Sequence, residues 1–219
     1  MAARPPARRP PLAQRARPLN AKRTLTERAD ALPALAEAFR EHGFEGASVS
    51  ILSKATGLGK GSLYNFFPGG KEEMIEAVLA DIDRWFATAI FAPLEQPDDP
   101  TSAIMAMIEV VTTYFRSGGK ICLVGLVGLG SSSDAVSVRI KRYFARWISA
   151  LGRCLEAGHV PPSQAEELAE ETVCGIQGAI VLTRALDDAA TFTRIVRRHE
   201  AALLDAIARH GPGAADGRL

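Results

Sequence analysis

Apolar and polar positions in this chain alternate with a helical period over most of its length. Apolar residues recur three or four positions apart between residues 32 and 67, and again in long segments between residues 71 and 209. Strand-like alternation does not persist, and no solenoid-type repeat is visible in the sequence. The pattern therefore predicts an all-α protein.

Residues 43–71 contain two short helical patterns separated by a glycine-centred turn. Ser48 stands where an N-cap hydroxyl can accept the free amides of the following turn. Gly57 is placed to end the first helix in the left-handed conformation. Between these two residues, helical spacing gives one apolar face made of Val49, Leu52 and Ala55.

The second short helix opens at Gly59 or Lys60 and stops before Pro68. Its inward positions are Leu63, Phe66 and Phe67, and its outward positions are Ser62, Tyr64 and Asn65. Tyr64 and Asn65 suit phosphate hydrogen bonds, and Ser62 is short enough to meet a base edge. Lys71 then opens another helix, where a cation and backbone amides together suit a phosphate. The alternative is an ordinary helical hairpin with solvated lysines.

Residues from about 25 to 80 resemble the N-terminal DNA-binding domain of the TetR family of transcriptional repressors. The resemblance runs through Phe39, Gly43, Phe44, Ser48, Val49, Ala55, Gly57, Leu58, Lys60, Gly61, Ser62, Leu63, Tyr64, Phe67 and Lys71. It implies an all-helical homodimer with a three-helix DNA-binding domain and a larger C-terminal domain that dimerises and binds a small effector. The DNA contacts expected from the resemblance and the residue types are Ser48, Lys60, Gly61, Ser62, Tyr64, Asn65 and Lys71.

Three further stretches are similar to the branch of this family that includes the LmrA and YxaF repressors. They read F-P-G-G-K-E-E-M, C-L-V-G-L-V-G-L-G and G-I-Q-G-A-I-V-L-T-R-A-L. Two positions depart from the family pattern. Gly59 replaces the usual Ser, Thr or Ala, which removes a side chain from the cap, and Pro33 lies within the first helix. That helix begins near Leu32, or begins near Glu27 and kinks. Its apolar stripe of Leu32, Leu35, Ala36 and Phe39 survives either choice.

The charge distribution divides the chain into a basic front and an acidic back. Residues 1–71 hold 12 Lys or Arg against 5 Asp or Glu, whereas residues 72–219 hold 14 against 20. We expect a disordered Pro/Arg-rich tail over 1–23, a helix-turn-helix domain over 24–70, a helical effector and dimerisation domain over 71–210, and a flexible tail over 211–219. The basic tail either adds non-specific phosphate contacts or is simply solvated.

Long helical patterns follow Lys71. The first covers 71–92 and is broken by Pro93, Pro97 and Pro100. Others cover 101–117, a glycine-rich segment at 121–130 that suggests close packing, 134–157 with a cap in Ser131–Asp134, 163–187, and 191–209.

Two faces of the C-terminal helices are expected to carry function. The effector pocket is predicted to be lined by Trp85, Phe86, Met105, Ile108, Cys122, Leu126, Tyr143 and Trp147. The dimer interface is predicted to include Leu168, Thr172, Gly175, Ala179, Leu182, Ile195 and Leu203. For each pocket residue, ordinary core packing is the better single interpretation, whereas each interface residue fits a core and an interface equally well.

Enzymatic chemistry finds little support in the sequence. The four histidines form no metal-ligand spacing, and no nucleophile elbow, phosphate loop or nucleotide fingerprint occurs. We therefore expect no cofactor, no metal and no catalytic residue. Three widely spaced cysteines, without a secretory leader or a membrane-length apolar run, fit a reducing cytoplasm.

The residues and the resemblance together predict a repressor that an apolar or aromatic effector releases from a palindromic operator in double-stranded DNA. Two alternatives stay open. The C-terminal domain could bind a protein partner with no small ligand, or the chain could be a helical enzyme.

Overall fold

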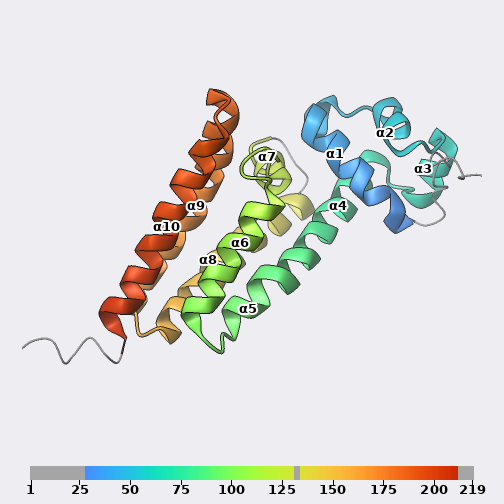
Figure 1. Cartoon of the computed structure of the whole chain (residues 1–219). Helices are drawn as coiled ribbons and strands as arrows, with labels where there is room; N and C mark the ends of the chain where they lie inside the picture. Colours follow the sequence, from blue (N-terminus) through green and yellow to red (C-terminus); the bar gives the residue numbers. More distant parts are fainter. Residues whose placement is uncertain (1–27, 131–133, 212–219) are drawn as a thin grey trace, which may run out of the picture.

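A computed structural model describes residues 28–130 and 134–211, and the regular elements within them are all helical (Figure 1). They are α1 (Arg28–Gly46), α2 (Val49–Thr56), α3 (Lys60–Phe66), α4 (Gly70–Phe86), a π-helical turn (Ala87–Phe91), α5 (Ala92–Glu95), α6 (Pro100–Tyr114), α7 (Leu123–Gly128), α8 (Asp134–Ala157), α9 (Pro162–Leu186) and α10 (Ala189–His210). The all-α prediction is therefore confirmed. The tail predictions over 1–23 and 212–219, and the serines of the cap before Asp134, lie outside the described residues.

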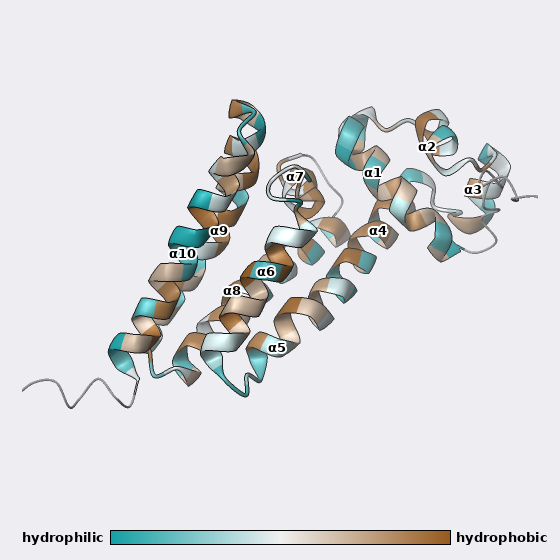
Figure 2. Ribbon diagram, viewed as in Figure 1, coloured by the Kyte–Doolittle hydropathy of each residue, from teal (hydrophilic) through white to brown (hydrophobic). Residues whose placement is uncertain are grey.

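The helices form two regions joined by α4. Helices α1, α2 and α3, here called the head, gather at one end of the molecule (Figure 1). Helices α5 to α10, here called the body, lie at the other end, where α9 and α10 form an antiparallel pair that packs on α8 and α6. Apolar residues concentrate on α4, α6 and α9, whereas polar residues mark the outer turns of α10 (Figure 2). No helix in the described part of the chain is both long enough and apolar enough to cross a membrane.

Helix α1 includes Pro33 and is already helical at Arg28, the first described residue. Within α1, the residue with non-helical torsions is Gly43, at φ 68° and ψ 172°. The helix therefore starts before Pro33, and its change of direction falls at a glycine that tolerates positive φ. Its predicted stripe of Leu32, Leu35, Ala36 and Phe39 is buried as expected.

The predicted break at Pro93 is wrong. The helical path continues from α4 through the π-helical turn and includes Pro93 in α5, ending at Glu95. In this turn the Ala92 amide bonds to the Ala87 carbonyl, one residue further back than in an α-helix. Proline has no amide to donate, so a local widening just before it lets the chain remain helical.

Close approaches explain the glycines around α7. Gly118 has φ 88°, and a Cβ there would lie 2.8 Å from Thr183 Oγ1 of α9. A Cβ on Gly128 would lie 3.2 Å from Ile140 Cγ2 of α8. The tight packing expected for the glycine-rich segment at 121–130 is thus found, with α7 pressed against α8.

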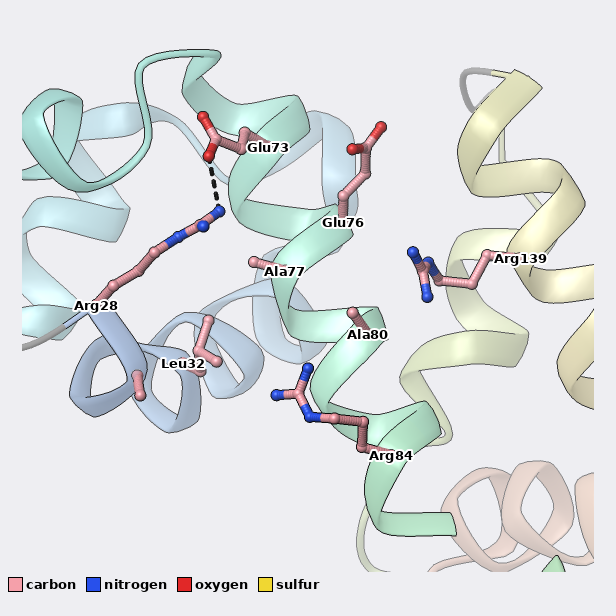
Figure 3. A pocket seen from close by; sticks show the side chains of 9 residues that line it. Arg28, Leu32, Glu73, Glu76, Ala77, Ala80, Arg84 and Arg139 are labelled. Carbon is pink, nitrogen blue, oxygen red and sulfur yellow. Dashed lines mark hydrogen bonds and ion pairs between the residues drawn. The ribbon is translucent and has the colours of Figure 1, made fainter. Parts of the chain in front are cut away.

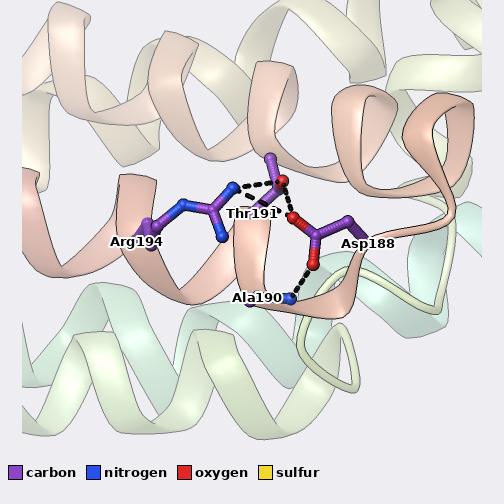
Figure 4. Close-up of polar contacts among 4 residues, drawn as sticks. All are labelled: Asp188, Ala190, Thr191 and Arg194. Carbon is purple, nitrogen blue, oxygen red and sulfur yellow. Dashed lines mark hydrogen bonds and ion pairs between the residues drawn. The ribbon is translucent and has the colours of Figure 1, made fainter.

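The turn between α9 and α10 is organised by two aspartates. Asp187 ends α9 in the left-handed conformation, at φ 49°. Asp188 then caps α10: its carboxylate accepts from the Ala190 amide at 3.0 Å, from Thr191 Oγ1 at 2.7 Å and from Arg194 at 3.0 Å (Figure 4). These bonds hold the Asp188 carboxyl pKa below its usual value, through the Thr191 hydroxyl first and Arg194 second. They fix the sharp reversal that sets α10 along α9.

An aromatic cluster fills the space between α4, α6 and α8. Phe86 of α4 lies at its centre, with ring centroids 4.9 Å from Tyr114, 5.1 Å from Tyr143 and 5.5 Å from Trp147. Phe86, Tyr143 and Trp147 are almost fully buried. Because aromatic edges and faces attract, this cluster anchors the end of α4 in the body.

Candidate nucleic-acid interface and effector region

The caps that define the helix-turn-helix occur as the sequence predicts. Ser48 Oγ accepts the Ile51 amide at 3.3 Å, and Gly57 ends α2 at φ 72°. The turn is closed by Ser53 Oγ, which donates to the Leu58 carbonyl at 2.6 Å. Gly59 precedes α3 with no side-chain cap, as its identity requires. These short-range bonds fix the angle at which α3 leaves the turn.

One part of the predicted α2 face is wrong. Ala55 is exposed, and Thr56 occupies the buried position beside Leu52. The Thr56 hydroxyl donates to the Leu52 carbonyl at 2.8 Å, so its polar atom is satisfied inside the helix. A threonine can therefore serve as a core residue here.

Helix α3 has a buried side and a polar exposed side. Leu63 and the following Phe67 have no exposed surface, and Phe66 is half-buried. The exposed positions are Lys60, Gly61, Ser62, Tyr64 and Asn65, which are the predicted DNA-contact residues of this helix. A surface of small, amide, phenol and ammonium groups suits phosphates and base edges more than an apolar partner.

The start of α4 differs from the expected free phosphate site. Lys71 is half-buried; its Nζ lies 4.5 Å from the Phe44 ring centroid and 3.4 Å from the Glu45 carbonyl oxygen. Glu73 accepts the Gly69 amide at 2.8 Å and the Arg28 guanidinium at 2.7 Å. Lys71 thus ties α4 to the end of α1, and a carboxylate of the chain already occupies one amide there.

A groove of about 440 Å³ separates the head from the start of α8. Figure 3 shows Arg28 reaching Glu73 on α4, and Arg139 extending from α8 toward α4, where Glu76 and Arg84 also line the groove. The groove is lined by charged side chains of α1, α4 and α8, so it lies where the head, the connecting helix and the body meet.

The predicted effector residues do not line one pocket. Phe86, Tyr143 and Trp147 belong to the aromatic cluster, and Trp85 is partly exposed and stacks on Tyr114 at 4.6 Å. Met105 and Ile108 line a groove between α6 and α10, whereas Cys122 and Leu126 line a separate cavity beside α7. Helical spacing identified apolar residues correctly but could not show which of them share a cavity.

The cavity beside α7 has a volume of about 470 Å³ and lies between α7, α8 and α9. Apolar side chains form most of its wall, including Leu126, Ile140, Phe144 and Ile180. Sequence reasoning missed Gln177, the polar residue of this wall. The available signal was its position as a lone amide within the apolar run G-I-Q-G-A-I-V.

The predicted interface residues divide between core and surface. Thr172, Ala179 and Leu203 are buried inside the protomer, so they cannot present side chains to a second copy. Leu182 is exposed, and Leu168, Gly175 and Ile195 are half-buried. Helices α9 and α10 of the same protomer approach closely at Gly175, because a Cβ there would fall 2.0 Å from His199 Nε2 of α10.

A contact outside α4 also joins head and body. Arg40 of α1 is only 8% exposed, and its Nε donates to the Ile121 carbonyl at 3.1 Å, just before α7. Its guanidinium also pairs with Glu37 at 2.8 Å. Helix α7 packs on α1 around this bond. The head is therefore linked to the body through α4 and through Arg40.

Comparison with known proteins agrees with this geometry. Residues 32–78 match the model of bacterial regulatory proteins of the tetR family, and residues 100–198 match the C-terminal domain of LmrA/YxaF-like transcriptional regulators. The chain is 28% identical over 160 residues to the HTH-type transcriptional regulator Rv0196 of Mycobacterium tuberculosis, covering 68% of this chain and 79% of that protein. It is 27% identical over 157 residues to the HTH-type transcriptional repressor DhaR of Mycobacterium sp. strain GP1, covering 66% and 76%.

The fold is also that of solved TetR regulators. A TetR transcriptional regulator from Legionella pneumophila superposes with a TM-score of 0.70 at 18% identity, covering 79% of this chain and 95% of that one. The chain belongs to the TetR family, with a C-terminal domain of the LmrA/YxaF-like type. It is a helix-turn-helix transcriptional regulator, and this family is not one of enzymes.

Proposed function

We propose that this regulator is a homodimeric repressor that binds a palindromic operator and is released by a small molecule. The observation that carries the proposal is the exposed polar side of α3, presented by a capped turn at the end of the molecule furthest from α10. A relative, DhaR, is named as a repressor, which favours repression over activation. Two α3 helices of a dimer would enter successive major grooves, roughly 34 Å apart.

The exposed surface of α9 and α10 supports dimerisation. Glu166, Glu167, Glu170 and Glu171 lie exposed in the first half of α9, and Arg194, Arg197 and Arg198 lie exposed in the first half of α10. Because the two helices are antiparallel, these acidic and basic groups lie at opposite ends of the pair. A two-fold axis across the pair would place each acidic end against the partner's basic end.

The proposed coupling runs along the two links between head and body. Ligand binding in the body would move α4 into the groove that Arg139 lines between α4 and α8. This movement would change the distance between the two heads of the dimer. A coupling of about 1–3 kcal/mol would weaken operator binding about 5- to 150-fold.

The test is binding of the purified protein to DNA from upstream of its own gene, measured by fluorescence anisotropy against a scrambled duplex. Tyr64→Phe removes a hydroxyl and keeps the ring that lies against Gly70, so operator affinity should fall while folding is unchanged. Gln96→Ala, remote from the head, is the matched control. Equal affinity for the scrambled duplex would refute sequence-specific regulation at that site.

Dimerisation has its own test. Leu182→Arg places a charge on the exposed face of α9, and light scattering should then report a monomer that still folds. A dimer that survives this change would place the interface elsewhere.

A further inference from the structure

The cavity beside α7 contains a buried polar atom, Gln177 Nε2, that has no hydrogen-bond partner among the described residues. We infer that this cavity is the effector site, that its ligand is a neutral, mainly apolar molecule with one hydrogen-bond acceptor, and that Gln177 donates to that acceptor. This inference rests on the proposed release of the regulator by a small molecule. It adds the location of the effector site, the chemical class of the ligand and the residue that recognises the ligand.

The wall of the cavity excludes a charged ligand. Among the described residues, no Asp, Glu, Lys, Arg or His lines it. An ion entering such a wall would lose its hydration without gaining a counter-charge, whereas an apolar surface would be stabilised there. A volume of about 470 Å³ falls within the range typical of small-molecule sites. The ligand is therefore neutral and mostly hydrocarbon or aromatic in character.

Gln177 supplies the one specific polar contact. Its Nε2 is buried and has no hydrogen-bond partner in the described structure. Its Oε1 faces α7, because a Cβ on Gly125 would lie 3.0 Å from that oxygen. The Gln177 carboxamide acts on the neighbouring Cys122 thiol, where it opposes the burial that raises the thiol pKa, but no acceptor among the described residues lies within hydrogen-bonding distance of Nε2. An unpaired buried donor is costly, so an acceptor on a bound molecule would be strongly selected at this point.

The Cys122 thiol strengthens the assignment of a neutral site. Burial raises the pKa of the thiol above its usual value, with the Gly125 amide opposing the shift at 3.4 Å from Sγ. The sulfur therefore stays protonated at neutral pH and adds to the apolar wall.

The cavity touches the second link between body and head. Ile121 lines it, and the Ile121 carbonyl accepts the bond from Arg40 of α1. A ligand that displaces Ile121 therefore acts directly on a buried arginine of the head. This position explains how occupancy beside α7 could be sensed by α1 without passing along α4.

Nile red provides the probe, because it is neutral, largely aromatic and carries a carbonyl acceptor. Its fluorescence should rise on titration with the full-length protein, and anionic anilinonaphthalene sulfonate should bind more weakly. Gln177→Leu keeps the volume and removes the donor, so Nile red should bind about 3- to 10-fold more weakly, the loss of one neutral hydrogen bond. Gln164→Leu, on the same helix and beside His210, is the matched control and should bind as the wild type does.

Thermal unfolding without probe separates a ligand-binding role from a structural one. Because Gln177→Leu removes an unpaired donor, its melting temperature should rise while its Nile red affinity falls. A lower melting temperature, or unchanged affinity, would overturn the assignment. Leu126→Trp fills the cavity from the α7 side and should abolish binding even if Gln177→Leu folds poorly. Nile red binding that appears only as the dimer dissociates would assign the cavity to a subunit contact instead.

DNA binding is measured on the same samples. Own-gene DNA that binds normally while Gln177→Leu leaves Nile red affinity unchanged would overturn this inference and leave the proposed function standing. Nile red binding that depends on Gln177, without any specific DNA binding, would preserve the site and refute the proposed function.

Discussion

The head and the body treat their buried polar atoms differently. In the head, the polar side chains of the turn bond to backbone groups within five residues, as Ser48, Ser53 and Thr56 do. In the body, four buried side-chain atoms have no partner among the described residues: Tyr143 Oη, Trp147 Nε1, Gln177 Nε2 and Thr183 Oγ1. Among the described residues, the head therefore has no unpaired buried side-chain atom, although its buried Arg40 bonds to the Ile121 carbonyl of the body, whereas the body retains four unpaired atoms.

This difference matches the two functions proposed for the regions, which are DNA binding by the head and ligand binding by the body. A surface that must present side chains to DNA gains from a rigid, locally bonded scaffold. Unpaired buried groups reduce stability, and such costs are expected where a site is kept ready for a ligand. The difference between head and body can be tested by two kinds of mutation: those that remove a buried apolar side chain and those that remove a single hydrogen-bonding group.

The largest expected effect is a packing defect in the head. Leu63→Ala removes a fully buried side chain of α3 and should lower the free energy of unfolding by about 2–5 kcal/mol. The exposed neighbour Asn65→Ala should change it by no more than about 0.5 kcal/mol. Denaturant unfolding followed by circular dichroism measures both. A loss below about 1 kcal/mol for Leu63→Ala would mean that the head is not tightly packed.

The second effect has the opposite sign and lies in the body. Tyr143→Phe removes a hydroxyl without a partner and keeps a ring that contacts Phe86 and Phe91. The free energy of unfolding should therefore rise by about 1–3 kcal/mol, the cost of leaving a polar group unpaired. Tyr114→Phe is the control: the Tyr114 hydroxyl interacts with Arg40, and burial raises its pKa to about 12, so its removal should bring no gain. Equal gains in both variants would contradict the contrast.

Features of the head could be predicted from the sequence better than features of the body, because they depend on residues close together in the chain. Ser48 and Gly57 mark the ends of α2 through bonds and torsions formed within a few residues, so their roles were predicted correctly. The polar side of α3 followed from the same short segment. Ala55 was placed wrongly because α2 is short, and the orientation of such a helix depends on the helices packed against it.

In the body the helices were predicted but their partners were not. Pro93 stays helical because the π-helical turn before it absorbs the missing amide, a feature with no simple sequence signal. The predicted effector residues separated into three places, since periodicity shows which face is apolar but not which helix covers it. Gln177 was missed for the same reason, because only the fold shows that its amide lacks a partner.

A smaller effect tests the local bonds of the head. Ser48→Ala removes the cap that accepts the Ile51 amide and should cost about 0.5–2 kcal/mol of stability. Ser50→Ala, exposed within α2, should be neutral or slightly stabilising, because alanine is the better helix former. Identical unfolding curves for the two variants would show that the cap adds nothing to the head.

The smallest expected effect tests an ion pair of the body whose partners are far apart in the sequence but adjacent in space. Glu95 at the end of α5 pairs with Arg146 at 2.9 Å and with Arg153 at 3.2 Å, both from α8. The Arg146 hydrogen bond holds the Glu95 pKa below its ordinary value of 4.5, although partial burial opposes it. Since the folded pKa is the lower one, this contribution is complete above about pH 4.5 and is lost as the pH falls through the folded pKa.

Glu95→Gln should therefore reduce stability by no more than about 1 kcal/mol at neutral pH, and the difference from wild type should vanish in acid. Glu156→Gln, exposed near the end of α8, is the matched control and should change the free energy of unfolding by no more than about 0.5 kcal/mol. Urea unfolding midpoints between neutral pH and acid measure both variants. A wild-type difference that persists in acid would mean that Glu95 acts through packing rather than through its charge. The contact between α5 and α8 would then be stabilised by apolar packing, as in the surrounding core, and not by hydrogen bonds, as in the turn of the head.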